Sequence, residues 1–149
     1  MKILALNNVD TRSFCRVMDT DIEIDIPFLS LKVPAGSPSP ADQYIEETVN
    51  LNKVLIRKPQ ATFCIRVIGD SMIGAGINED DILIVDSSIT PTHNKIVVAA
   101  VDGDLTVKRL YYQKGKVLLC PENEKYSPIE VKNKEFNIWG VVTFVIHQT

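Results

Sequence analysis

An alternation of apolar and polar residues is dense in the 114 residues after residue 35 and constrains the fold more than any other feature. Successive side chains of a strand point to opposite faces of a sheet, so a period of two predicts strands. Their expected spans are 53–56, 62–68, 82–85, 95–101, 105–112, 116–119 and 136–146. Asp102-Gly103 and Lys114-Gly115 mark hairpin turns, which predicts a three-stranded meander over 95–119. The expected fold class is mainly β.

The first part of the chain has a different pattern. Residues 1–35 lack the apolar stripe of a helix. They contain two short alternating runs, 22–26 and 29–33, which predict extended strands with a break at Pro27. We therefore expect an N-terminal arm, residues 1–35, ahead of a compact β domain, residues 36–149.

A joint separates these two parts. Residues 33–40 contain three prolines and one glycine, so regular structure cannot continue through them and the joint is expected to be exposed. Pro40 suits the first position of a helix, and residues 41–47 are predicted to form one short helix.

Composition narrows the function classes. The 149 residues are 45% hydrophobic and 23% charged, as in an ordinary globular domain. The net charge of −3 comes without a long basic run, which disfavours autonomous DNA binding. Cys15, Cys64 and Cys120 are odd in number and widely spaced, so neither a disulfide framework nor a metal site is expected. No stretch has the length of a signal peptide or a membrane span, and a cytoplasmic protein without a cofactor is predicted.

A glycine-rich turn follows the predicted strand 62–68 and carries a candidate nucleophile. The turn runs through residues 69–76 and contains Ser71 at the end of a rigid strand. Taken alone, a serine in such a turn is more often a hydrogen-bonding turn residue. A nucleophilic serine needs a base, and both histidines, His93 and His147, are expected at the surface.

Lys108 is the alternative base. A lysine can deprotonate a serine only when its amine is neutral, which requires desolvation among apolar groups. Lys108 lies in the middle of the predicted strand 105–112 and shares its face with Thr106 and Leu110. The competing interpretation is a lysine whose amine simply reaches water.

The joint has the features of a substrate within the same chain. In an extended backbone Val33 and Ala35 project to the same side, where two shallow pockets can recognise them. Pro34 fixes the backbone before the Ala35-Gly36 bond, and Gly36 has no side chain to obstruct attack. The competing interpretation is a proline-rich hinge without chemistry.

Together, Ala35-Gly36, the Ser71-Met72 turn and the strand around Lys108 resemble the cleavage site, nucleophile and base of the LexA/UmuD family of self-cleaving serine-lysine peptidases. The family's fold is the compact β fold also seen in signal peptidases. The similarity is greatest to the UmuD branch and extends to residues 38–42, 81–87, 126–129 and 139–142. The chain departs from the family at Asp80, where glycine is common; aspartate tolerates a positive φ, so only a small adjustment is expected.

The resemblance implies that Ser71 attacks the Ala35-Gly36 carbonyl while neutral Lys108 takes its proton. The backbone amides of Ser71 and Met72 would stabilise the oxyanion. The family's reaction is stimulated by a RecA filament on single-stranded DNA. A UmuD-like product, residues 36–149, would form a homodimer and serve a UmuC-type Y-family polymerase in mutagenic bypass of DNA damage during the SOS response.

Other interpretations remain open. Residues 1–35 are too few for the helix-turn-helix of a family repressor, so direct sequence-specific DNA binding is not expected. A signal-peptidase-like enzyme would need a membrane anchor. A dimeric binding module or repressor-like regulator that does not cleave would carry the same serine and lysine without using them. The sequence does not indicate whether cleavage would occur within one chain or between two.

Overall fold

The computed structural model describes residues 14–16, 23–29, 33–36, 46–132 and 134–149. The chain divides into two units, one of residues 19–57 and one of residues 1–18 with 58–149. Both are built mainly from antiparallel strands, and the described residues include one short α-helix. The predicted fold class is confirmed.

The unit of residues 19–57 contains a two-stranded sheet. Strand β2 (Asp25–Leu29) pairs with β3 (Glu46–Asn50), and Pro27 lies opposite Thr48. The predicted break at Pro27 is therefore wrong. Each strand of a two-stranded sheet is an edge, and an edge tolerates a residue that cannot donate to the ladder.

The helix of this unit is α1 (Leu51–Leu55), which directly follows β3. The side chain of Asn50 caps it by accepting a hydrogen bond from the Lys53 N–H at 3.2 Å. This cap explains why the strand predicted at 53–56 is wrong, since the alternating residues there belong to a helical turn. The helix predicted over 41–47 is also wrong at its end, because residues 46 and 47 lie in β3; residues 41–45 lie outside the described residues.

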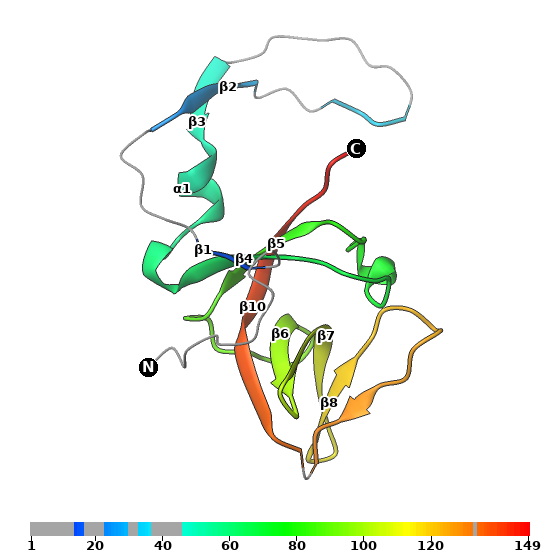
Figure 1. Ribbon diagram of the computed structural model, residues 1–149. Helices are drawn as coiled ribbons and strands as arrows, with labels where there is room; N and C mark the ends of the chain where they lie inside the picture. The colour runs from blue at the N-terminus through cyan, green and yellow to red at the C-terminus, as the bar shows by residue number, and fades with distance from the viewer. Residues whose placement is uncertain (1–13, 17–22, 30–32, 37–45, 133) are drawn as a thin grey trace. The chain divides into compact units, whose positions relative to one another are not determined.

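The larger unit contains an eight-stranded antiparallel sheet (Figure 1). Its strands, in spatial order, are β1 (Phe14–Arg16), β4 (Thr62–Arg66), β5 (Ile82–Asp86), β10 (Phe136–Ile146), β6 (Ile96–Val101), β7 (Asp104–Gln113), β8 (Lys116–Cys120) and β9 (Ile129–Glu130). Two 3₁₀ turns accompany them, η1 (Pro59–Ala61) and η2 (Ile73–Ala75). The six predicted strands from residue 62 onward are confirmed, with ends that shift by up to two residues.

The predicted meander is β6-β7-β8, whose strands lie side by side (Figure 1). Both hairpin turns have two consecutive residues with positive φ: 51° and 90° at Asp102 and Gly103, and 49° and 73° at Lys114 and Gly115. Such turns match the twist of the flanking strands. Asp80 also has a positive φ, 67°, as expected at a position where the family often has glycine.

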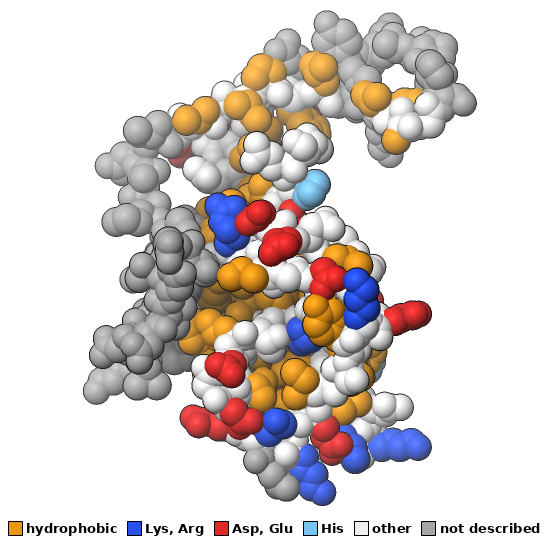
Figure 2. Space-filling model, turned by 45° about the vertical axis from the view of Figure 1, so that its right-hand side comes forward, with side chains coloured by type: hydrophobic (Ala, Val, Ile, Leu, Met, Phe, Trp, Pro, Cys, Tyr) orange, Lys and Arg blue, Asp and Glu red, His pale blue; other side chains and the backbone are white. Residues whose placement is uncertain are grey.

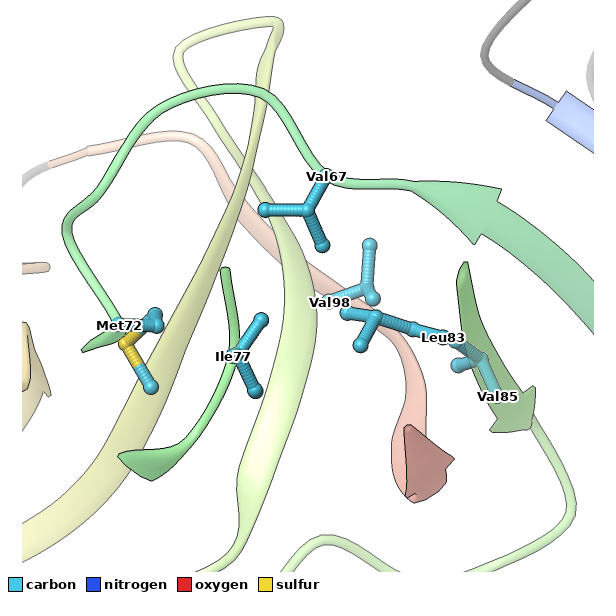
Figure 3. Close-up of a cluster of buried hydrophobic side chains, with 6 residues drawn as sticks. All are labelled: Val67, Met72, Ile77, Leu83, Val85 and Val98. Atoms are coloured by element: carbon cyan, nitrogen blue, oxygen red, sulfur yellow. The ribbon is translucent and has the colours of Figure 1, made fainter. Parts of the chain in front are cut away.

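Two clusters of buried side chains form the core. Val97 and Val98 are neighbours on β6, are both fully buried, and belong to different clusters. Since neighbouring residues of a strand project to opposite faces, the clusters lie on opposite sides of β6. The first, shown in Figure 3, consists of Val67, Met72, Ile77, Leu83, Val85 and Val98. This cluster supports the turn that carries Ser71.

Two features that would indicate a membrane or nucleic-acid partner are a long apolar helix and a large surface area of one charge. Among the described residues, no helix is long and apolar enough to cross a membrane. In the space-filling view, the acidic and basic side chains of the described part are interspersed (Figure 2).

Candidate active site

Ser71 lies in a turn that the core holds from one side. The turn follows β4. At its base the N–H of Val67 donates to the Asp81 carbonyl at 2.9 Å, and the N–H of Asp80 donates to the Val67 carbonyl at 3.0 Å. Met72 is only 2% exposed, and its side chain packs beside Ile77 at one end of the buried cluster (Figure 3). The Met72 carbonyl accepts the N–H of Ile77 at 3.3 Å. The residue after Ser71 is thus fixed by packing, which fixes the direction of Ser71.

Lys108 lies in the middle of β7, opposite the fully buried Val97 of β6. The residue is 8% exposed, so its amine does not reach freely into water. Its Nζ lies 2.9 Å from each of three oxygens: Ser71 Oγ, Thr106 Oγ1 and the Val107 carbonyl. The structure therefore brings the predicted nucleophile and the predicted base into direct contact.

Burial lowers the pKa of the Lys108 amine from its ordinary value of 10.5. Desolvation is the cause, because removing an ammonium from water disfavours its charged form. Within the described part of the chain, no carboxylate is in contact with this amine. No negative charge therefore stabilises the ammonium form and raises the pKa again. The neutral amine consequently becomes available at a lower pH than for an exposed lysine.

A cleft of about 400 Å³ opens beside these two residues. Its walls are largely apolar and include Ile68, Leu105 and Val107 next to Ser71 and Lys108. Ile68 is 80% exposed although it is a large hydrophobic residue. An apolar cleft with two convergent polar groups is the arrangement expected of a substrate-binding site.

Comparison with known proteins assigns the family. The sequence profile of Peptidase S24-like proteins matches residues 27–143. The chain belongs to this family. It is 42% identical to protein SamA of Salmonella typhimurium over 128 residues, which cover 86% of this chain and 89% of SamA. It is 41% identical to protein MucA of Escherichia coli over 120 residues, covering 79% and 82% of the two chains. A LexA repressor from Shewanella piezotolerans is 40% identical over 128 residues, which cover 85% of this chain and 61% of the repressor.

These relatives confirm the resemblance to the UmuD branch and identify the chain as a serine peptidase of the S24 family.

The site of this S24 peptidase also contains groups that the sequence does not single out. The sequence predicts that Thr106 shares the face of Lys108, but it does not predict the contact between Thr106 and Nζ. No local pattern predicts the contacts of Asp70 with Asn123 and Tyr126, because they join residues more than 50 positions apart.

Asp70 precedes the nucleophile and is held by a hydrogen-bond network. The Tyr126 hydroxyl donates to its carboxylate, and Lys125 Nζ lies 3.5 Å from the other carboxylate oxygen. The bond from Tyr126 is the main reason that the pKa of Asp70 is lowered, and the same bond raises the pKa of Tyr126. Asp70 therefore stays ionised at neutral pH and ties the turn to Tyr126, which also lines the cleft.

The predicted cleavage segment lies in the unit of residues 19–57, whereas Ser71 and Lys108 belong to the other unit. Its residues Val33, Pro34, Ala35 and Gly36 are all exposed, and Val33 is exposed to 78%. A Cβ added at Gly36 would meet no atom within 4 Å. The backbone of this segment is accessible within its unit.

Both histidines are exposed, as predicted, and each is engaged elsewhere. His93 Nδ1 accepts the N–H of Tyr112 at 3.0 Å, and His147 Nδ1 lies 2.7 Å from a carboxylate oxygen of Asp81. Neither contacts Ser71 among the described residues. The described residues contain no group of three side chains that could hold a metal ion.

Proposed function

We propose that this S24 peptidase is a UmuD-like protein of the SOS response that cuts its own Ala35-Gly36 bond. The observation that carries the proposal is the 2.9 Å contact between Ser71 Oγ and Lys108 Nζ inside an apolar cleft. Ser71 is the nucleophile and Lys108 the general base. Residues 1–35 are the arm that cleavage removes, and residues 36–149 are the peptidase domain that remains.

The ammonium form of Lys108 can donate to all three oxygens around Nζ, and the same contacts can be kept by a neutral amine once one proton is lost. Such an amine has two N–H donors and one lone pair. The Val107 carbonyl can only accept, and the Thr106 hydroxyl can accept the second N–H. In the neutral form the lone pair is left for the third neighbour, and the bond between Nζ and Ser71 Oγ can then reverse so that the hydroxyl donates to Nζ. This is the arrangement that a serine needs before it attacks a carbonyl.

The reaction proceeds in two halves. Ser71 Oγ bonds to the carbonyl carbon of Ala35 as its proton passes to Lys108 Nζ, and the N–H groups of Ser71 and Met72 hold the resulting oxyanion. Lys108 returns the proton to the leaving amine of Gly36, and an ester on Ser71 remains. A water molecule then attacks this ester, its proton passes through Lys108 to Ser71 Oγ as the ester bond breaks, and the Ala35 carboxylate is released.

Val33 and Pro34 are the recognition residues of the cleavage segment. Val33 is apolar and suits the apolar walls of the cleft. Pro34 restricts the backbone before the scissile bond, which lowers the entropy lost when the segment binds in an extended form.

Resemblance to the UmuD branch supports the biological part of the proposal. A RecA filament on single-stranded DNA stimulates cleavage by increasing the population of the reactive conformer, without adding a catalytic group. The product 36–149 forms a homodimer and serves a UmuC-type Y-family polymerase in translesion synthesis. The protein needs no cofactor and acts in the cytoplasm without direct sequence-specific DNA contact.

Incubation of the purified chain at about pH 10 tests the proposal, because alkali deprotonates Lys108 without RecA. We expect a fragment that begins at Gly36, identified by mass. Ser71→Ala and Lys108→Ala remain intact, whereas Lys116→Ala, which changes an exposed lysine of the neighbouring strand, is cut like the wild type. A wild type as stable as Ser71→Ala would contradict self-cleavage and favour a non-cleaving dimeric binding module. A mixture of the Ser71→Ala chain, which keeps an intact cleavage segment, and a Gly36→Val chain, which keeps the Ser71-Lys108 dyad, gives product only if the segment of one subunit reaches the dyad of another.

A further inference from the structure

The two peptide groups that flank Ser71 are both held by one distant segment. Asn123 Nδ2 donates to the Asp70 carbonyl at 2.9 Å. The backbone N–H of Glu122 donates to the Ser71 carbonyl at 2.8 Å. The first carbonyl belongs to the Asp70-Ser71 peptide, and the second belongs to the Ser71-Met72 peptide. These are the two peptides whose N–H groups the proposed mechanism assigns to the oxyanion.

A trans peptide group is planar, and its C=O and N–H point in opposite directions. Fixing the Asp70 carbonyl therefore fixes the direction of the Ser71 N–H, and fixing the Ser71 carbonyl does the same for the Met72 N–H. In the described part of the chain, neither N–H has an acceptor. Both donors thus point away from residues 122–123 and remain available to a substrate oxygen.

A bond to the carbonyl also strengthens the donor on the same peptide. The carbonyl oxygen that accepts a hydrogen bond withdraws electron density from the amide nitrogen, so hydrogen bonds along such a chain reinforce one another. Asn123 and Glu122 accordingly improve both the aim and the strength of the two donors.

Asn123 is itself held in one orientation. Its side-chain Oδ1 accepts the N–H of Lys125 at 3.1 Å, and its carbonyl accepts the N–H of Tyr126 at 3.1 Å. Because Oδ1 faces an N–H, the amino group of the side chain must be the part that faces the Asp70 carbonyl. A reversed side-chain amide would lose both bonds.

Glu122 anchors the segment at two further points. Its carbonyl accepts the N–H of Gly74 at 2.8 Å, and a Cβ at Gly74 would lie only 2.6 Å from that oxygen. Its carboxylate pairs with Arg109, the residue after Lys108. The segment therefore connects the serine turn to the strand that carries the lysine.

We infer that Asn123 is a positioning residue of the oxyanion site, which orients and polarises the Asp70-Ser71 peptide. The inference rests on the proposed self-cleavage and adds to it a residue that contacts neither the substrate nor the dyad side chains.

The test compares Asn123→Asp and Asn123→Ala with the wild type across a series of alkaline pH values. Asn123→Asp keeps the shape and the Oδ1 acceptor but replaces the donor with an oxygen, and Asn123→Ala removes the donor without adding charge. Glu124→Gln is the matched control, since it makes the reverse exchange at an exposed position of the same turn. Losing an oxyanion donor costs about 10²–10³ in rate, so misdirecting one is expected to slow cleavage at the pH plateau by about 10- to 100-fold.

The pH profile separates this role from general damage. We expect the plateau to fall while the apparent pKa of the profile, set by Lys108, stays at the wild-type value. A plateau within twofold of the wild type in both folded variants would overturn the inference. So would a loss of rate with a displaced apparent pKa, because Asn123 would then act on the dyad.

The amide resonances of Ser71 and Met72 provide a measurement that does not need cleavage. Removing the Asn123 donor should shift the Ser71 N–H to lower frequency, while the Met72 N–H, which Glu122 governs, moves less. An unchanged Ser71 resonance would refute the positioning role even if the wild type cleaves. If the wild type does not cleave but the resonance moves as expected, the proposed function fails and the orientation of the peptide stands.

Discussion

Burial of the Lys108 amine should be measurable as a pH-dependent cost to folding. The pKa of this lysine is lowered in the folded chain, whereas in the unfolded chain it keeps its ordinary value of 10.5. Between these two values the unfolded chain binds a proton that the folded chain does not. The free energy of unfolding must therefore rise with pH in this window, by about 1.4 kcal/mol per pH unit for one proton.

Lys108→Met isolates this effect. Methionine has a similar length but does not titrate, so its lost hydrogen bonds to Ser71 and Thr106 add only a constant difference. Both chains would carry Gly36→Val, because a branched side chain beside the scissile carbonyl hinders attack while a Cβ there meets no neighbour within 4 Å. Urea unfolding at intervals from pH 7 to 11 gives the free energies.

We expect the stability of the wild type relative to Lys108→Met to be lowest and constant below the folded pKa of Lys108. It should then rise with the slope of one proton and become constant again above 10.5. A difference that stays constant from pH 7 to 11 would refute the desolvation of Lys108, and with it the basis for a neutral base.

Three further changes test the scaffold. Gly140→Ala should lower the free energy of unfolding by about 1–3 kcal/mol, because its Cβ would lie 2.7 Å from Val85 Cγ1 and 3.0 Å from the Asp86 carbonyl oxygen; urea unfolding measures it. Leu119→Ala, at a fully buried position, should cost about 2–5 kcal/mol in the same assay, and a loss below 1 kcal/mol would contradict its place in the core. The pKa of Asp81 is lowered, mainly by the hydrogen bond from the N–H of Asn78 and also by His147. The ionised Asp81 carboxylate therefore stabilises the fold above pH 3.8, and this stabilisation is lost as pH falls through the folded pKa. Acid unfolding should therefore show Asp81→Asn to be less stable than the wild type at pH 5 and closer to it at pH 2, and a constant difference would refute this.

The sequence predicted the larger sheet well because its signals are local. Period-two alternation and the turns at Asp102-Gly103 and Lys114-Gly115 act within a few residues, and the structure follows both. The sequence predicted a strand over 53–56 where α1 lies, because the decisive signal there is the Asn50 cap, which the alternating pattern does not reveal. The short strands β1 and β9, of three and two residues, have too few positions to show a period.

The sequence predicts which residues form the candidate site, but not the packing and hydrogen bonds that hold them in place. Ser71 and Lys108 follow from the chemistry that each can perform, and the structure places them in contact. The degree of burial of Lys108 depends on strands packed around it, which no local pattern reveals. The bond from Asn123 to Asp70 spans 53 positions and depends on the same assembly.

The pH dependence of the self-cleavage rate tests the central claim most directly. If the neutral amine of Lys108 is the base, the first-order rate of fragment release rises tenfold per pH unit and levels off at a pKa below 10.5. That value must coincide with the lower break in the stability curve. A rate that does not change with pH, or a Lys108→Met chain that is cut at the wild-type rate, would contradict the account.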